Sequence, residues 1–468
     1  MSPEGERPVV YPYIPNSPPA IRAQMLQAVG ARTTDELYAA IPDRLRYGYR
    51  LDIPDGIGGE FELRAHVEGL LNGNRHTREA LSFLGGGCWP HFVPAVCDEI
   101  ASRGEFLTGY HDGASSMLGS YQAQFEFQSM LGALVGLDMV STTTYDWGSA
   151  AASSLLMASR LTGRATVHVP AAMSPMRRRQ IAAIAGPSLT IDPIAWDPTS
   201  GGLDIDRLTR SVTGDTAAVY VEVPAYLGCL EPNLARIGEI AHEAGALLVV
   251  GVDPISLGVL SAPADYGADI VCGDIQPLGI HMYFGGGLAG FIATRHEAAY
   301  IRECPTLLVS ILETEQPGEY AFGWWNFDQT SYAYRGESAD FAGTTQTIWA
   351  IVAATYLAVM GPQGLREVGE AIVTRSAYAA ERLSRMPGVV APVFGGASHF
   401  AEFAVNFDAT GKTVRAVMAG LRDRGIYGGI DLSEPFPELG QSALVCVTEV
   451  HSIDDIDRLA SALEEVLR

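Results

Sequence analysis

The sequence predicts an α/β fold whose main domain holds a mostly parallel β-sheet. Between about residues 140 and 300, short apolar runs alternate with amphipathic stretches. Continuous apolar strands separated by helices are typical of a parallel sheet that is buried on both faces. The expected strands are residues 165–169, 189–191, 217–223, 246–252, 270–272 and 288–293, and the expected helices between them include residues 207–212 and 233–244.

Three parts follow one another along the chain. Residues 1–110 combine Pro-rich stretches with stretches of helical pattern, so we expect an N-terminal arm with short helices that contributes to a subunit interface. Residues 111–345 form the large α/β domain, which begins with a helix at about 117–135. Residues 346–468 contribute a helix and a small α+β C-terminal domain, with strands 400–406 and 442–447 among helices 364–386, 413–424 and 452–467.

Charge and composition narrow the class of protein. The 468 residues carry 31 basic and 54 acidic side chains, a net charge of −23, so nucleic acid is not expected as a partner. With 47% hydrophobic residues the chain can bury large cores. No apolar run reaches the ~18–20 residues of a membrane span, so no membrane partner is expected. The first residues lack the pattern of a signal peptide, and we expect a cytoplasmic protein.

The residues that commonly hold metals or form covalent intermediates give little support to such chemistry. The 6 cysteines have no C-x-x-C spacing and are expected to fill cores. His91, His111 and His281 show no metal-ligand spacing, so a metal site is not predicted, and a buried or interface position is the simpler interpretation of each. Lys412 is the only lysine, in a polar turn where solvation is expected. Motifs typical of hydrolases and nucleotide-binding proteins do not occur.

The segment from Thr144 to Ala151 predicts the start of a helix. Asp146 or Ser149 would cap this helix, and Gly148 would let an anion approach the exposed N–H groups. Helix N-termini bind phosphate for that reason. An ordinary capped helix explains the same residues and is the more frequent case.

Polar residues follow two of the expected strands. Asp253 ends an apolar strand, where the carboxyl ends of parallel strands form a ligand crevice. A carboxylate there suits a protonated ring nitrogen such as the pyridinium of pyridoxal phosphate, although a turn aspartate is the commoner case. Gln276 lies in the next polar loop, before a glycine cluster at 285–287 where the backbone must approach something closely, such as another subunit.

Several blocks along almost the whole chain carry a resemblance to a known family. They include Ser82-Phe-Leu-Gly-Gly-Gly, His91-Phe-Val-Pro-Ala-Val, Val252-Asp-Pro-Ile-Ser-Leu-Gly, Gln276-Pro-Leu-Gly-Ile and Gly425-Ile-Tyr-Gly-Gly. In these blocks the chain resembles subunit 1, the alpha half, of the split glycine dehydrogenase (decarboxylating). That enzyme is the P-protein of the glycine cleavage system.

The resemblance implies a type I pyridoxal-phosphate-dependent transferase fold in which an alpha and a beta chain pair. In the family the cofactor lysine belongs to the beta subunit. The matching stretch here is Asp274-Ile-Gln276-Pro277, so no Schiff base can form and no catalytic residue is expected in this chain. Gly148, Ser149, Asp253 and Gln276 are then interpreted as remnants of a cofactor pocket.

The family's reaction sets the expected function. Glycine loses carbon dioxide, and its aminomethyl group passes to a lipoyl H-protein, which is a further expected partner. We therefore expect the alpha subunit of a glycine decarboxylase, inactive without its beta subunit, with pyridoxal phosphate bound covalently by that partner. The pocket-mouth or interface candidates are Trp89, His91, Tyr110, His111 and Arg335.

Departures from the family pattern keep two alternatives open. The family's tyrosine-rich segment is replaced by residues 110–116, and its basic segment by residues 334–347. These changes favour a divergent paralogue that serves a different pyridoxal-phosphate-dependent decarboxylation or carbon–carbon reaction. A non-catalytic scaffold that kept the fold is the third interpretation.

Overall fold

The computed structural model describes residues 17–46, 52–54, 56–77, 79–107, 117–325, 340, 342–343 and 345–468. The chain divides into two compact units, Met1–Asn74 and Arg75–Arg468. The boundary between the units therefore falls earlier than residue 110, where the sequence analysis ended the arm. Residues 79–107 belong to the second unit, in which Phe83, Trp89 and Cys97 are buried.

The first unit is the helical arm that the sequence predicts. Its helices are α1 (Pro19–Ala28), the 3₁₀ turns η1 (Thr34–Tyr38) and η2 (Asp43–Leu45), and α2 (Glu60–Leu71). None of these four elements has a buried residue. Their apolar side chains are therefore left without a core.

A seven-stranded sheet forms the centre of the second unit, in the order β2-β8-β7-β6-β5-β3-β4. The strands β3 to β7 pair in parallel, whereas β8 is antiparallel to both β7 and β2. The six predicted strands are confirmed, and β2 was not predicted. The strands are β2 (Met139–Val140), β3 (Thr166–Pro170), β4 (Thr190–Ile194), β5 (Thr216–Val223), β6 (Leu247–Val252), β7 (Ile270–Asp274) and β8 (Gly290–Thr294).

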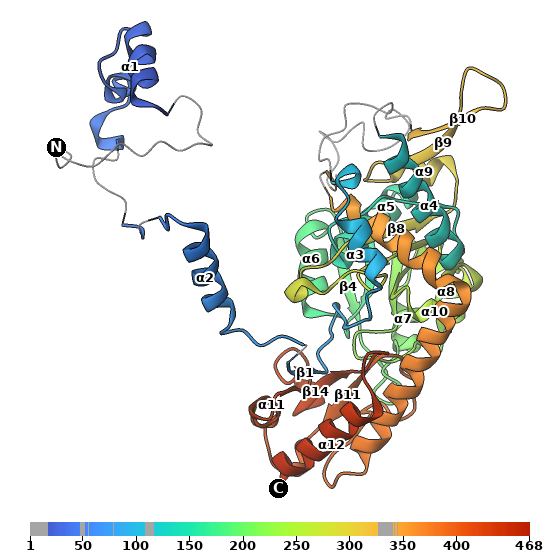
Figure 1. Cartoon of the computed structure of the whole chain (residues 1–468). Helices are drawn as coiled ribbons and strands as arrows, with labels where there is room; N and C mark the ends of the chain where they lie inside the picture. The colour runs from blue at the N-terminus through green and yellow to red at the C-terminus, as the bar shows by residue number, and fades with distance from the viewer. Residues whose placement is uncertain are drawn as a thin grey trace. The chain divides into compact units, whose positions relative to one another are not determined.

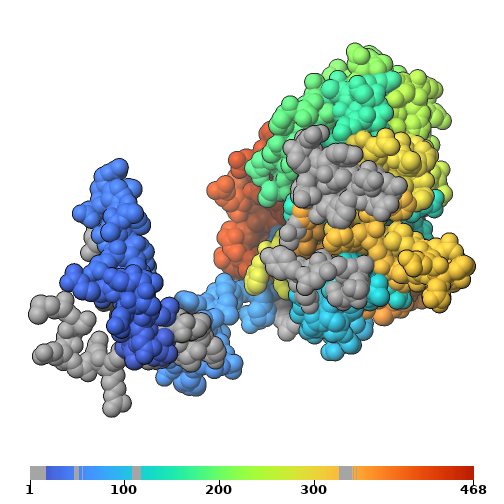
Figure 2. Space-filling view, turned by 90° about the horizontal axis from the view of Figure 1, so that it is seen from above, coloured from blue at the N-terminus to red at the C-terminus, as the bar shows by residue number. Residues whose placement is uncertain are grey.

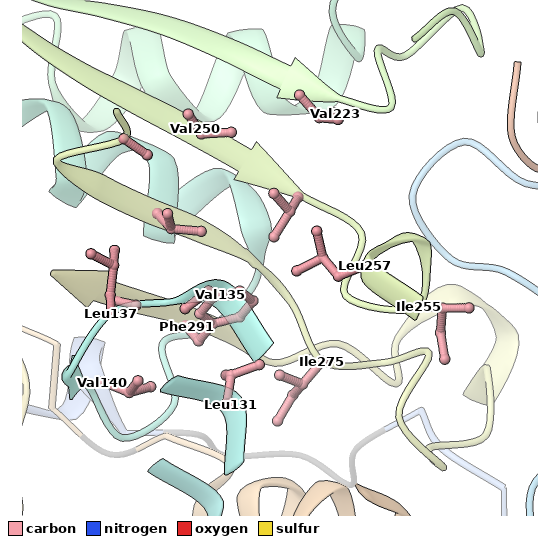
Figure 3. Close-up of a cluster of buried hydrophobic side chains, with 14 of the residues drawn as sticks. Leu131, Val135, Leu137, Val140, Val223, Val250, Ile255, Leu257, Ile275 and Phe291 are labelled. Carbon is pink, nitrogen blue, oxygen red and sulfur yellow. The ribbon is translucent and has the colours of Figure 1, made fainter. Parts of the chain in front are cut away.

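Helices cover both faces of this sheet (Figure 1). Alternate residues of β5 point to opposite faces: Val219 and Val221 enter one hydrophobic cluster, while Ala218 and Tyr220 enter another. The first cluster includes Leu131, Val135, Leu137, Val140, Val250 and Phe291 (Figure 3). The helices are α4 (Leu118–Val135), α5 (Trp147–Thr162), α6 (Pro175–Ile184), α7 (Ile205–Ser211), α8 (Leu234–Glu243) and α9 (Ala298–Glu303), with α3 (Ala95–Ala101) before them.

The long helix α10 (Thr347–Ser384) runs from the large domain to the small one (Figure 1). It bends at Gly361, whose φ of 60° is left-handed, directly before Pro362. Its length and an 18-residue stretch with a mean hydropathy of 1.4 would by themselves allow a membrane span, which was not expected from the sequence. Fourteen of its residues are buried, and it packs against α3 and α4. This contact pattern is that of a core helix.

The C-terminal part is the predicted small α+β domain. Its three-stranded antiparallel sheet has the order β11-β14-β13, and α11 (Val414–Asp423) and α12 (Ile453–Leu467) pack with it. Ser452 caps α12 in a capping box with Asp455. The strands are β11 (Glu402–Asn406), β13 (Ile430–Asp431) and β14 (Ser442–Cys446), while β12 (Ile426–Tyr427) pairs with β1 (Leu81–Ser82).

Short 3₁₀ turns and one hairpin complete the described chain. The turns are η3 (Gly104–Phe106), η5 (Ser256–Gly258), η6 (Pro263–Tyr266), η7 (Tyr283–Gly285), η10 (Asp408–Thr410) and η11 (Pro437–Leu439). Strands β9 (Val309–Glu313) and β10 (Tyr320–Trp324) form an antiparallel hairpin that contacts α4. In Figure 2 this part of the chain, coloured yellow to orange, lies at the surface. No strand was expected in this segment from the sequence.

Candidate functional site

The carboxyl ends of the central strands bring several of the predicted site residues together. Asp253 follows β6 directly, and Asp274 is the last residue of β7. The N-terminus of α5 meets the same edge, because the Trp147 amide donates to Asp274 Oδ2 at 3.2 Å. Asp253, Trp89 and Trp147 line one small cavity at this edge, as expected for a ligand crevice in an α/β sheet.

The N-terminus of α5 is capped by side chains of the protein itself. Asp146 Oδ1 accepts from the Ser149 amide at 2.7 Å, and Ser149 Oγ accepts from the Asp146 amide at 3.0 Å. Gln180 Nε2 donates to Asp146 Oδ2, and a Cβ built on Gly148 would lie 1.9 Å from Gln180 Oε1. Carboxylates and a glutamine therefore stand where a phosphate would have to approach, and the structure matches the ordinary capped helix.

Asp274 is buried at the end of β7 and receives three backbone hydrogen bonds. Its Oδ1 accepts from the amides of Gln276 at 2.9 Å and Ala289 at 3.1 Å, and its Oδ2 accepts from Trp147. Burial raises the pKa of Asp274 to about 7 despite these bonds. The carboxyl group thus holds β7, α5 and β8 together.

Asp253 is 4% exposed, and its carboxylate accepts from the Ile255 amide at 3.0 Å. Burial raises its pKa to about 6, while His91 acts in the opposite direction. The cavity beside it measures about 20 Å³, roughly the space of one water molecule. A cofactor site normally needs several hundred Å³.

Aromatic and charged side chains fill the rest of this edge. The Arg177 guanidinium lies 4.3 Å from the centre of the Trp147 ring and forms an ion pair with Glu222. The rings of Trp89 and Trp147 meet edge to face at 6.3 Å. The residues present do not fit pyridoxal phosphate, because the space is taken, the helix N-terminus is capped and no lysine follows β7.

Gln276 is 1% exposed and fastens the segment around Trp89 to the sheet edge. Its Oε1 accepts from the Trp89 amide at 3.0 Å, and its Nε2 donates to the carbonyl oxygens of Trp89 at 3.1 Å and Ile280 at 3.0 Å. Trp89 is itself only 5% exposed. Gln276 therefore acts as a structural clamp within the stretch, Asp274–Pro277, that the resemblance matched to the lysine-bearing segment.

His91 lies in a buried ion pair with a residue of the small domain. Its Nδ1 is 2.8 Å from Glu449 Oε2, and the Phe92 amide donates to Glu449 Oε1 at 2.8 Å. Burial by itself would lower the pKa of His91, but Glu449 and, more weakly, Asp253 raise it above its usual value. The pKa of Glu449 is held below its usual value by His91 and Phe92, against the effect of burial. The pair ties the loop at 89–92 to the small domain.

The other singled-out residues are dispersed. Tyr110, His111 and Arg335 lie outside the described residues, so the pocket-mouth or interface role of these three stays a prediction, as does that of Trp89 and His91. Lys412 is half-buried in the small domain, where Nζ donates to the Val466 carbonyl, rather than fully solvated as expected. In the part of the chain that the structure describes, no group of three His, Cys, Asp or Glu side chains could hold a metal ion.

Sequence reasoning missed Arg177, Glu222, Glu402 and Glu449. Arg177 and Glu222 are separated by 45 residues, and His91 and Glu449 by 358. No local spacing signals such pairs. The single acid Glu222 inside an apolar strand was the one available sign, since a charge in a strand buried on both faces requires a partner.

Comparison with known proteins gives a consistent result. The family model described as "Glycine cleavage system P-protein" matches residues 12–463. A "Probable glycine dehydrogenase (decarboxylating) subunit 1" from Staphylothermus marinus is 35% identical, with 98% of each chain covered. The same-named protein of Thermococcus onnurineus is 37% identical, with 97% of this chain and 99% of that one covered.

Solved structures agree with the sequence relatives. A crystal structure of glycine decarboxylase (P-protein) in inhibitor-bound form superposes with a TM-score of 0.85 at 34% identity, covering 97% of this chain and 99% of that chain. A sphingosine-1-phosphate lyase from Burkholderia pseudomallei superposes with a TM-score of 0.65 at 15% identity, over 92% of this chain and 94% of the other. The lyase likeness concerns the fold alone. The predicted type I pyridoxal-phosphate-dependent fold is confirmed.

Proposed function

Because the chain belongs to the glycine cleavage system P-protein family, we propose that it is the glycine decarboxylase subunit that lacks the cofactor lysine. In this proposal a second, beta-like chain carries pyridoxal phosphate on its own lysine, and the two chains form the active site together. A lipoyl H-protein accepts the aminomethyl group. The cofactor supplies the stabilisation of the carbanion that decarboxylation leaves behind.

The observation that carries the proposal is the filled cavity at the strand ends. Its volume of about 20 Å³ leaves no room for the cofactor, and Gln276 stands after β7 in a chain whose only lysine is Lys412. A family member whose sheet edge leaves no room for the cofactor has to work with a cofactor that another chain holds. Within this chain the strand-end residues bind one another and keep the loop at 89–92 in place.

The apolar surface of the arm supports the proposal that a partner chain binds here. Large side chains on its helices are exposed, among them Phe61 at 80%, Leu70 at 67% and Leu45 at 63%. Contiguous exposed apolar surface on a soluble protein usually marks an interaction site. Burial of this surface would also give the arm the core that its own helices lack.

The experiment is glycine-dependent exchange of labelled bicarbonate. We would measure it for the chain alone, and for the chain co-expressed with a beta-like chain that carries the cofactor lysine, with lipoyl H-protein supplied in both cases. The expected result is exchange in the complex and none in the single chain. Exchange by the single chain would contradict the assignment of the cofactor to the partner.

One specific observation keeps the divergent paralogue as a second candidate. Segments 110–116 and 334–347 depart from the family pattern where substrate and partner contacts are expected. A complex that binds pyridoxal phosphate but exchanges no bicarbonate with glycine would favour that candidate. A purified chain that never associates with a cofactor-binding protein would favour the scaffold.

A further inference from the structure

The loop between β7 and β8 carries an aromatic side chain with almost no cover. Phe284, in η7, is 94% exposed, and the neighbouring Tyr283 is 53% exposed. The loop follows Asp274 at the carboxyl end of β7 and leads into β8 at Gly290. It therefore lies at the same edge of the sheet as the strand-end residues, where α/β folds present their functional loops.

Two consecutive residues of this loop adopt left-handed backbone angles. The φ values of Tyr283 and Phe284 are 42° and 58°. Glycine adopts such angles readily and asparagine or aspartate does so occasionally, whereas a bulky side chain then comes too close to the following carbonyl oxygen. The loop thus holds two aromatic side chains where smaller residues would fold more easily. Strained residues of this kind cluster at active sites, ligand clamps and switch regions.

Contacts within the chain account for Tyr283 but not for its neighbour. The Tyr283 ring stacks on Trp349, near the start of α10, with ring centres 5.6 Å apart. The His281 ring meets it edge to face at 6.0 Å, and His281 Nε2 lies 2.9 Å from Asp98 Oδ1 on α3. Tyr283 is therefore held by α3 and α10. In the described part of the chain nothing covers the Phe284 ring in this way.

Backbone hydrogen bonds close the base of the loop. The amides of Gly285 and Gly287 both donate to the Met282 carbonyl, at 2.8 and 3.1 Å. A Cβ on Gly287 would lie 2.0 Å from the His281 carbonyl oxygen, so only glycine fits at this position. The loop is thus a fixed turn with Phe284 on its solvent side. A side chain whose backbone is held in place before binding loses less conformational freedom when a partner covers it.

The chemistry of the loop defines the partner. Residues 280–290 contain no acidic residue, arginine or lysine, in a chain whose net charge is −23. The partner must therefore offer an apolar pocket for a phenyl ring rather than an opposite charge. Aromatic side chains that fill such pockets provide much of the free energy of binding at protein interfaces. A membrane surface fits less well, because the loop has no lysine or arginine for anionic headgroups.

Two observations favour a beta-like chain over a second copy of this chain. Two copies would each bring a net charge of −23, and high net charge of one sign opposes association. The loop is also fastened to the segment that contains two of the predicted interface residues, Trp89 and His91. Gln276, at the start of the loop, accepts from the Trp89 amide, and Cys88 Sγ lies 3.7 Å from the Met282 carbonyl oxygen.

We propose that Phe284 is an anchor of the interface with the beta-like chain, and that its ring enters an apolar pocket of that chain. Phe284 is the most exposed large apolar side chain in the described part of the chain. Removal of its ring from water stabilises the complex and offsets the cost of the left-handed backbone. This inference rests on the function proposed above, which supplies the partner, and it adds the contact that holds the two chains together.

The test measures association of the full chain with a beta-like chain that carries the cofactor lysine, by analytical ultracentrifugation. Phe284→Ser should raise the dissociation constant at least about tenfold, as loss of an interface anchor does. Phe284→Tyr keeps the ring and should keep most of the affinity. The matched control is Val390→Ser, which removes a 50% exposed apolar side chain of the small domain and should leave the affinity unchanged.

A second measurement follows the ring itself. The full chain is produced with 4-fluorophenylalanine in place of phenylalanine, and the ¹⁹F NMR signal that is missing in Phe284→Tyr belongs to residue 284. We expect this signal to move on assembly with the beta-like chain. We also expect its frequency difference between light and heavy water to disappear, because the ring leaves the solvent.

The outcomes separate this proposal from the function on which it rests. An unchanged dissociation constant for Phe284→Ser would overturn the anchor and leave the proposed function intact. Failure of the unaltered chain to bind any beta-like chain would overturn both. A lower free energy of unfolding for isolated Phe284→Ser would also overturn the anchor, because the ring would then be covered by its own chain. Self-association that depends on Phe284 would replace the beta-like chain with a second copy.

Discussion

Arg177 and Glu222 form a bidentate ion pair in the interior of the large domain. Arg177 Nε donates to Glu222 Oε1 at 2.8 Å, and Nη2 donates to Oε2 at 2.7 Å. The two side chains are 8% and 1% exposed. Both charges are thus removed from water at the carboxyl ends of the strands. Each charge is compensated there by the other in place of water.

We expect Arg177→Met to destabilise the fold strongly. Removal of one partner of a buried ion pair leaves an uncompensated charge on Glu222, which typically costs about 3–5 kcal/mol. The free energy of unfolding from urea titration at neutral pH measures this loss. The double variant Arg177→Met/Glu222→Leu should recover much of the stability, because no buried charge remains.

The matched control is the exposed pair Arg366 and Glu370, with side chains 71% and 56% exposed. Arg366→Met should change the unfolding free energy little, since exposed pairs contribute little. A loss at Arg177 no larger than that at Arg366 would contradict the buried-pair interpretation.

Glu402 should make stability depend on pH. Its Oε1 accepts from the Gly86 amide at 2.6 Å, and burial raises its pKa to about 7. A raised carboxyl pKa means that the folded state binds more protons than the unfolded state. The contribution of Glu402 to the free energy of unfolding is therefore full below about pH 4 and is lost as the pH rises through about 7. Glu402→Gln should remove this loss, on the order of 3 kcal/mol between about pH 4.5 and pH 7.5.

Urea unfolding of both proteins across that pH range provides the measurement. Asp253 and Asp274 also have raised pKa values and contribute in the same direction, so the variant keeps a shallower slope. Parallel pH profiles for the two proteins would contradict the burial of an ionisable Glu402.

His91 should titrate above the usual histidine range because Glu449 stabilises its imidazolium. Imidazole ¹⁵N NMR should give a midpoint above about 6.5, and Glu449→Gln should move it downward. His168 is an internal control, since burial lowers its pKa despite the hydrogen bond to Asp192. If the titration midpoint of His91 is the same in the Glu449→Gln variant, the ion pair is ruled out.

The arm should matter for association with the partner proposed above. Phe61→Ser and Leu70→Ser replace apolar side chains that the arm itself leaves exposed on α2, so we expect weaker co-purification of the beta-like partner. Glu68→Ser, on the same helix, is the control and should preserve co-purification. If both apolar variants still co-purify fully with the partner, α2 is not part of the proposed interface.

The strands of the large sheet were predictable because their sequences are almost uniformly apolar. Residues 217–223 and 246–252 can only be buried on both faces, and they form β5 and β6 at the centre of the sheet. The cap at Asp146 and Ser149 was also predictable, since both partners lie within three residues. Hydrogen bonds between residues this close in the sequence do not depend on the rest of the fold, so the sequence is enough to predict them.

The hairpin and the site contacts were not predictable for physical reasons. In β9, Val309 and Ser310 are buried while Ile311 and Leu312 are exposed, so the hydrophobic pattern does not alternate as a half-buried strand should. The partners of His91 and Arg177 come from distant elements, and their pairing depends on how β5, α6 and the small domain pack. The sequence alone therefore places Asp253 and Gln276 after apolar strands but does not predict what surrounds them.

The strand-end cavity filled by this chain's own side chains has a consequence for cofactor supply. A ligand raises the melting temperature of a protein only if it binds the folded state, and it does so in step with its concentration. With about 20 Å³ beside Asp253, this chain should melt at the same temperature with or without added pyridoxal phosphate. If the cofactor is divided between the chains as proposed above, a shortage of pyridoxal phosphate would leave the thermal stability of this chain unchanged.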